Sequence, residues 1–117
     1  MKFNMRIIDK PWGFEKIIEQ NDNYVVKLLH MKKNHRCSLQ YHEKKHETFY
    51  VVDGVLKFYI GKNVDDLEEL VLHKGESYTI EPFVIHRMEA IEDADYIECS
   101  TNFLDDVVRL EDNYGRV

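Results

Sequence analysis

The chain consists largely of short segments in which Val, Ile, Tyr and Phe alternate with polar residues, separated by Gly, Asn, Asp or Pro. A repeat of two residues is typical of β-strands with one buried face. Strands are predicted at residues 14–19, 24–31, 37–42, 47–52, 55–60, 67–72, 77–80, 85–90 and 95–101. Many short, evenly spaced strands favour a sandwich or a barrel.

Two local signals refine this prediction. Asp53 and Gly54 lie between two strand-like segments, and an Asp-Gly pair is typical of a type I′ hairpin turn. Leu104, Val107 and Val108 recur at helical spacing, which predicts a short C-terminal helix within residues 104–112. We therefore expect an all-β, antiparallel fold with a short C-terminal helix, formed by residues 1–117 as one domain.

Charge and composition exclude several classes of partner. The net charge is −6 and no basic patch appears, which argues against nucleic-acid binding. No long apolar stretch occurs, so we expect neither a signal peptide nor a membrane span. Two cysteines do not make a disulfide framework, and the expected location is the cytoplasm.

The stretch CSLQYHEKKHETFYVVDG concentrates polar groups in strand-like sequence. Ser38, Gln40 and His42 share one strand face, and Glu47 begins the next strand, so a closed barrel would bring these side chains together. Their oxygen and nitrogen atoms suit a divalent transition metal, and His86 offers a further ligand. The alternative is that Gln40 and His42 line a solvated groove while Glu47 pairs with a lysine.

The spacing of this stretch resembles the first motif of the cupin superfamily. In that motif a His-x-His pair is followed by a Glu and a Gly, as His42, Glu47 and Gly54 are spaced here. Gln40 occupies the position of the first His. The resemblance implies a cupin-type β-barrel, also described as a jelly roll or double-stranded β-helix.

Residues 75–90 resemble the second cupin motif, with His86 as its metal-binding histidine. Glu81, Phe83 and Ala90 stand where proline, glycine and asparagine are usual. These departures concern the loop before His86 and leave the histidine itself in place.

A narrower resemblance covers nearly the whole chain. The phrases KPWGFE, YVVK, SLQYH, ETFYVVDG, IHR and DDVVRLEDNYGR occur in the same order as in type II phosphomannose isomerases. In those proteins the cupin usually follows a mannose-1-phosphate guanylyltransferase domain. This chain has no Gly-rich nucleotide-binding loop, and we expect a cupin that stands alone.

This resemblance implies a metal-dependent aldose–ketose isomerase that interconverts mannose 6-phosphate and fructose 6-phosphate. It also implies one divalent metal ion held by Gln40, His42, Glu47 and His86. Zinc accepts such mixed ligands, and manganese, cobalt, nickel or iron would fit as well. The expected partner is a phosphorylated sugar.

Arg109, in the C-terminal phrase, is the first candidate for a catalytic residue. A guanidinium donates paired hydrogen bonds to a phosphate or an enediolate. On the predicted helix Arg109 would lie on the same side as Asp105 and Asp106, so the alternative is a surface ion pair.

Further candidates come from the other phrases of the resemblance. Lys27, on an apolar strand, is the second expected catalytic residue, while Ser38 and Arg116 are expected to bind substrate. Lys27, His46 and Glu98 are all candidates for the base that removes the carbon-bound proton.

Two alternatives to the mannose 6-phosphate reaction stay open at this point. One is an isomerase of another sugar phosphate. The other is a non-catalytic cupin that binds a sugar phosphate or sugar nucleotide and acts beside another enzyme, which the looser second motif favours. We also expect a homodimer, because exposed strand edges invite pairing.

Overall fold

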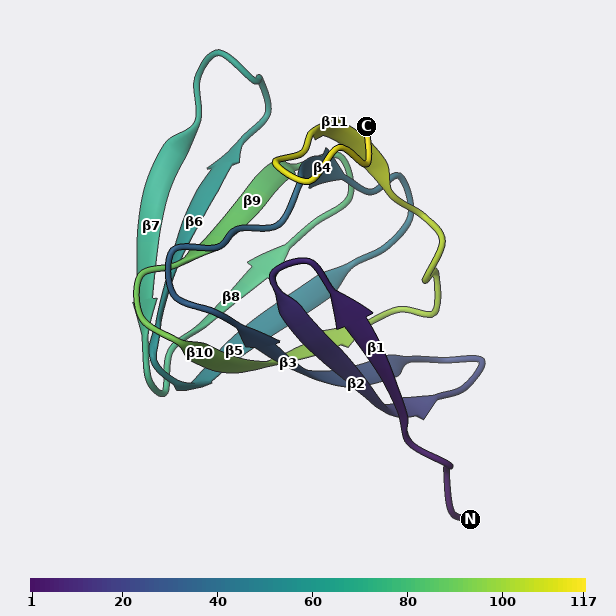
Figure 1. Ribbon diagram of the computed structural model, residues 1–117. Coiled ribbons are helices and arrows are strands. Elements are labelled where there is room, and N and C mark those ends of the chain that lie inside the picture. The colour runs from purple at the N-terminus through teal and green to yellow at the C-terminus, as the bar shows by residue number, and fades with distance from the viewer.

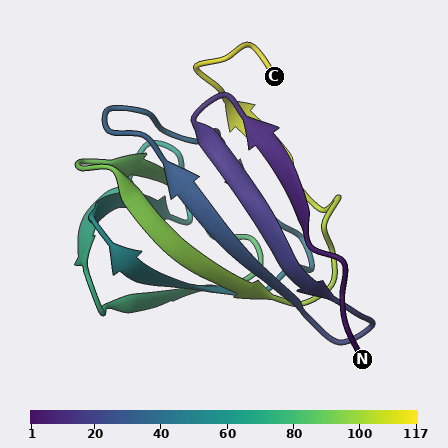
Figure 2. The ribbon, with the colours of Figure 1, turned by 60° about the horizontal axis from the view of Figure 1, so that its bottom comes forward.

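The computed structural model describes residues 1–117, which form two antiparallel β-sheets packed face to face (Figures 1 and 2). The six-stranded sheet comprises, in spatial order, β1 (Arg6–Lys10), β2 (Gly13–Gln20), β3 (Val25–Met31), β10 (Ala94–Ser100), β5 (Glu47–Asp53) and β8 (Ser77–Ile80). The five-stranded sheet comprises β11 (Val108–Glu111), β4 (Leu39–Tyr41), β9 (Ile85–Ala90), β6 (Val55–Gly61) and β7 (Glu68–His73). The predicted all-β, antiparallel fold is confirmed. The chain forms no helix with the length and apolar character needed to cross a membrane.

The core lies between the two sheets and follows from the alternation within each strand. In β3, for example, every second residue from Val25 to Met31 is buried. Aromatic side chains fill the centre, where Phe49 of β5 contacts Phe58 of β6 edge to face at a ring-centroid distance of 5.5 Å. The inner faces of both sheets therefore build one continuous core.

The hairpin predicted at Asp53 and Gly54 is wrong. The strand before this turn, β5, belongs to the six-stranded sheet, and the strand after it, β6, belongs to the five-stranded sheet. Gly54 has a φ of 86°, and a Cβ atom there would lie 2.1 Å from the carbonyl oxygen of Asp93. Glycine is required here because the chain crosses from one sheet to the other against the backbone of another turn.

The predicted C-terminal helix is also wrong, because the chain forms β11 within this segment and adds to the edge of β4. The apolar spacing of Leu104, Val107 and Val108 fits a helical face, but two consecutive valines favour an extended chain. A short isolated helix is marginal in water, whereas the edge of β4 supplies backbone hydrogen bonds to a strand.

We predict that Gly54→Ala destabilises the protein much more than Gly75→Ala. Both glycines have a φ of 86°, so each substitution imposes the strain of a left-handed backbone, about 1–2 kcal/mol. At Gly75 nothing lies within 4 Å of the new Cβ, whereas at Gly54 it meets the Asp93 backbone. Overpacking should therefore add roughly 1–3 kcal/mol for Gly54→Ala. Urea unfolding of the two variants measures the difference, and equal losses would contradict this account.

Candidate metal centre and its cavity

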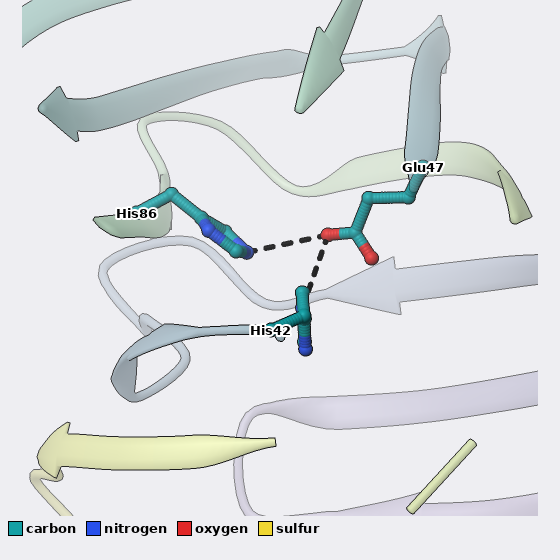
Figure 3. Close-up of side chains that lie close together, drawn as sticks. All are labelled: His42, Glu47 and His86. Atoms are coloured by element: carbon teal, nitrogen blue, oxygen red, sulfur yellow. Dashed lines mark ion pairs between the residues drawn. The ribbon is translucent and has the colours of Figure 1, made fainter. Parts of the chain in front are cut away.

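Two histidines and a glutamate converge in the interior at one end of the sandwich. His42 follows β4, His86 lies in β9, and Glu47 is the first residue of β5 on the opposite sheet. Figure 3 shows the three side chains directed toward one another. The Oε1 atom of Glu47 lies 3.4 Å from Nε2 of His42 and 3.2 Å from Nε2 of His86. Their ligand atoms all lie within 4.8 Å of one another, as a shared metal ion requires.

The other ring nitrogen of each histidine fixes its tautomer. Nδ1 of His42 lies 2.5 Å from the carbonyl oxygen of Asp106, and Nδ1 of His86 lies 3.0 Å from that of Val84. A carbonyl oxygen only accepts hydrogen bonds, so each Nδ1 carries a proton and each ring directs its Nε2 atom toward Glu47. Neither Nε2 atom has a hydrogen-bond partner.

These buried nitrogen and oxygen atoms make the site suitable for a cation. Burial raises the pKa of Glu47, but the two imidazoles and the ammonium of Lys45 lower it by more, so the pKa lies well below its usual range. A buried carboxylate oxygen that faces two imidazole nitrogens needs a proton or a cation between them. Histidines oriented by backbone carbonyls are typical of metal centres, and this donor set fits a divalent transition metal.

Gln40 and Arg109 lie in one row with His86 across the five-stranded sheet. In the pairing of β4 with β9, Gln40 is opposite His86, and in the pairing of β4 with β11 it is opposite Arg109. Paired residues share a sheet face, so these side chains belong to the face that carries the histidines. Ser38 Oγ donates a hydrogen bond of 2.6 Å to Gln40 Oε1. The role of Gln40 as a metal ligand stays a prediction.

A polar cavity lies between the sheets next to this centre. Most of the residues predicted from the sequence to act in the site line this cavity, together with residues that the sequence did not single out. The lining includes Lys10, Glu15, Lys27, Ser38, Gln40, His42, Lys45, Tyr96, Glu98, Arg109 and Arg116. Among the candidate bases, Lys27 and Glu98 line the cavity, whereas His46 is exposed outside it.

A series of alternating charges runs along the cavity from the metal centre. Nζ of Lys45 lies 3.0 Å from Oε2 of Glu47 and 3.0 Å from Oε2 of Glu98. Nζ of Lys27 lies 3.8 Å from Oε2 of Glu98 and 3.0 Å from Oε2 of Glu15. Lys10 completes this ion-pair series, which consists of Glu47, Lys45, Glu98, Lys27, Glu15 and Lys10.

The ion-pair series keeps buried groups charged. Burial lowers the pKa of Lys45, but the carboxylates of Glu98 and Glu47 raise it to a value above the usual one. Burial likewise raises the pKa of Glu15, and Lys27 and Lys10 lower it by more. The charged forms of Lys45 and Glu15 therefore depend on their neighbours in the series.

The two cavity arginines differ in their partners. Arg116 donates two hydrogen bonds of 2.9 Å to the carboxylate of Asp112. Arg109 has no acidic partner, and its Nε atom is buried without a hydrogen bond. The surface ion pair considered for Arg109 does not form, because the Asp106 carboxylate accepts hydrogen bonds from backbone N–H groups of residues 43–45. Arg109 is thus an uncompensated cation beside the cavity.

Comparison with known proteins identifies the family. Residues 2–112 match the family described as Mannose-6-phosphate isomerase C-terminal. The chain belongs to this family. It is 32% identical to mannose-1-phosphate guanylyltransferase of Escherichia coli K12 over 96% of its own length and 23% of that protein. It is 33% identical to the xanthan biosynthesis protein XanB of Xanthomonas campestris, over 95% of its length and 24% of that protein. The chain therefore spans about a quarter of these relatives.

Solved structures share the fold at low sequence identity. KdgF from Halomonas sp. superposes with a TM-score of 0.75 at 19% identity, covering 86% of this chain and 90% of that one. The capsular polysaccharide assembling protein CapF from Staphylococcus aureus gives 0.76 at 21% identity, covering 94% and 35%. Oxalate decarboxylase from Bacillus subtilis gives 0.79 at 14% identity, covering 92% and 30%. These likenesses establish the cupin fold.

The mannose 6-phosphate isomerase activity expected from the sequence is wrong. The relatives that match nearly the whole chain bear the name of a guanylyltransferase or of a polysaccharide biosynthesis protein, although the family description keeps the isomerase name. The shared phrases identify a cupin region within longer enzymes and do not specify its reaction. The alternative of a non-catalytic cupin agrees better with these relatives.

Lys45→Met should destabilise the protein strongly, because it leaves Glu47 buried without a cation and leaves Glu98 with only the more distant Lys27. Breaking a buried pair in this way typically costs about 3–5 kcal/mol. Lys57→Met is the matched control, because Lys57 Nζ lies at the same 3.0 Å from Glu69 but on the exposed surface. The free energy of unfolding of Lys57→Met should stay close to that of the parent. Similar losses in both variants would show that Lys45 has no special role.

Proposed function

We propose that this chain is a metal-holding cupin that binds a phosphorylated sugar and acts beside a sugar-nucleotide-forming enzyme without performing the chemistry itself. The observation that carries the proposal is Arg109, which lies beside a polar cavity without an acidic partner. A phosphate would supply the missing anion, because the guanidinium fork donates paired hydrogen bonds to its oxygens.

The charge balance of the cavity supports an anionic ligand. The ion-pair series contains as many lysines as glutamates, and Asp112 compensates Arg116. Arg109 therefore leaves a surplus positive charge, although the chain as a whole carries −6. A divalent cation at the metal centre would add to this positive field, which would attract a phosphate group.

The remaining polar groups of the cavity suit the hydroxyls of a sugar. Ser38 and Gln40 form a hydrogen-bonded pair on the wall, and the Tyr96 hydroxyl is buried without a partner. Burial raises the pKa of Tyr96 well above its usual value, so the phenol stays neutral and can donate. The ligands that fit this description are hexose phosphates such as mannose 1-phosphate, named in the relatives, or their nucleotide derivatives.

His42, Glu47 and His86, with Gln40 as the fourth ligand, would hold one divalent metal ion. Zinc suits these nitrogen and oxygen donors, and manganese, cobalt, nickel and iron are the alternatives. When bound, the ion would supply a Lewis acid that orients a sugar oxygen. In this proposal Arg109 binds the phosphate, and Lys27 remains part of the ion-pair series. The catalytic roles that the sequence suggested for these two residues stay predictions.

His42→Ala should lower the metal content, because it removes one of the converging nitrogens. His46→Ala is the matched control, since His46 is exposed and lies outside the cavity. The purified parent and His46→Ala should each contain about one divalent ion per chain, measured by plasma mass spectrometry after incubation with zinc. Full metal content in His42→Ala would overturn the assignment of the ligands.

Arg109→Ala should weaken binding of mannose 1-phosphate by roughly 10- to 100-fold. Hydrogen bonds to charged groups contribute about 1.5–3 kcal/mol, which corresponds to this range. Arg109→Lys should recover part of the loss. Arg6→Ala, a change outside the cavity, should bind like the parent. Titration calorimetry with zinc-loaded protein measures the affinity of the parent and of the three variants. If the parent chain binds no sugar phosphate and no nucleotide sugar, the proposed function is refuted.

A further inference from the structure

Asp106 contacts the metal centre through both its backbone and its side chain. Its carbonyl oxygen accepts a hydrogen bond of 2.5 Å from Nδ1 of His42. Its carboxylate accepts the backbone N–H groups of residues 43, 44 and 45, at 3.1, 2.7 and 2.8 Å. These three residues belong to the loop that joins His42 to Glu47. One aspartate therefore contacts a converging histidine and the loop that leads from it to the converging glutamate.

The carboxylate of Asp106 ties its stretch of chain to the rest of the protein. Residues 101–107 form neither strand nor helix, and the backbone–backbone hydrogen bonds of residues 103–107 stay within this stretch. The strand that follows, β11, pairs with β4 over only a few residues and with a shift in register. The bond from His42 requires the Asp106 carbonyl to stay in one position, and the carboxylate supplies the fixed point for it.

We infer that Asp106 is a positioning residue for the metal centre and that it links a bound ion to Arg109. The inference rests on the metal centre of the proposed function. The carboxylate fixes the Asp106 backbone against residues 43–45, and the carbonyl then holds the His42 ring with Nε2 toward Glu47. Hydrogen-bond partners of metal-binding histidines typically change metal affinity by about 10- to 100-fold.

The link to Arg109 follows from the short distance along the chain. Arg109 comes three residues after Asp106 and lies opposite Gln40 in the pairing of β11 with β4. Figure 1 shows β11 beside β4 near the C-terminus. An ion that fixes His42 would also fix the Asp106 carbonyl, and with it the chain that enters β11. Because such coupling is reciprocal, metal binding should order the strand that carries Arg109.

The first test compares the zinc affinity of Asp106→Ala with that of Asp105→Ala. Both substitutions remove one negative charge from the same turn, so the general attraction for a cation changes similarly. The Asp105 side chain is exposed, and the N–H groups of residues 43–45 bind Asp106 instead. Competition with a chromophoric chelator should show an affinity about 10- to 100-fold lower in Asp106→Ala and close to the parent in Asp105→Ala. Asp106→Asn, which keeps one acceptor oxygen, should fall between them.

A purely structural role of Asp106 gives a different result. It would lower the melting temperature of the metal-free protein and leave the zinc affinity of the folded protein unchanged, which would overturn the inference. Circular dichroism checks that each variant is folded at the temperature of the titration. If Asp106→Ala does not fold, Asp106→Asn decides between the two roles.

Hydrogen exchange tests the link to Arg109. Zinc should slow the exchange of the backbone amides of β11 in the parent and in Asp105→Ala, and much less in Asp106→Ala. Equal protection of β11 in all three would overturn the link. A parent that binds no zinc would overturn the metal centre together with this inference. A parent that binds zinc but no sugar phosphate or nucleotide sugar would refute only the proposed ligand.

Discussion

The carboxylate of Glu47 is the group around which the interior of this protein is arranged. One oxygen faces Nε2 of two histidines, and the other pairs with Lys45. A carboxylate buried to this extent is stable only when charges or donors compensate it. Lys45 meets this need on one side, and a divalent cation would meet it on the other.

The surrounding backbone holds this arrangement in place. Asp106 uses its carbonyl oxygen to orient His42 and its carboxylate to accept the N–H groups of the loop that leads to Glu47. The same segment continues into β11, whose pairing with β4 brings Arg109 into the row of Gln40 and His86. His42 and the arginine proposed to bind phosphate are thus positioned by one C-terminal segment.

The sequence predicted most of the strands, because their alternation reflects burial on one face. The ranges predicted for β8 and β9 match the structure. The strand β1 was not predicted, since most of its residues are exposed and only its pairing with β2 defines it. The spacing that suggested a helix near Val107 was ambiguous, and a distant partner, the edge of β4, decided between helix and strand.

The convergence of His42, Glu47 and His86 could be predicted from the strand faces and from the cupin spacing. The ion-pair series could not be predicted, because Lys45 and Glu98 lie far apart in the sequence and neither carries a local signal of burial. The reaction could not be predicted from the sequence either. The shared phrases identified the family, but they also occur in relatives that are about four times as long and bear other names.

The origin of the three converging ligands has a mechanical consequence. His42 directly follows β4 and His86 lies in β9, both strands of the five-stranded sheet, whereas Glu47 belongs to the six-stranded sheet, so an ion held by all three would cross-link the two layers. Separation of the layers at this end would then require release of the ion. Because a ligand that binds the folded state stabilises it by mass action, the free metal concentration would set how often the sandwich opens.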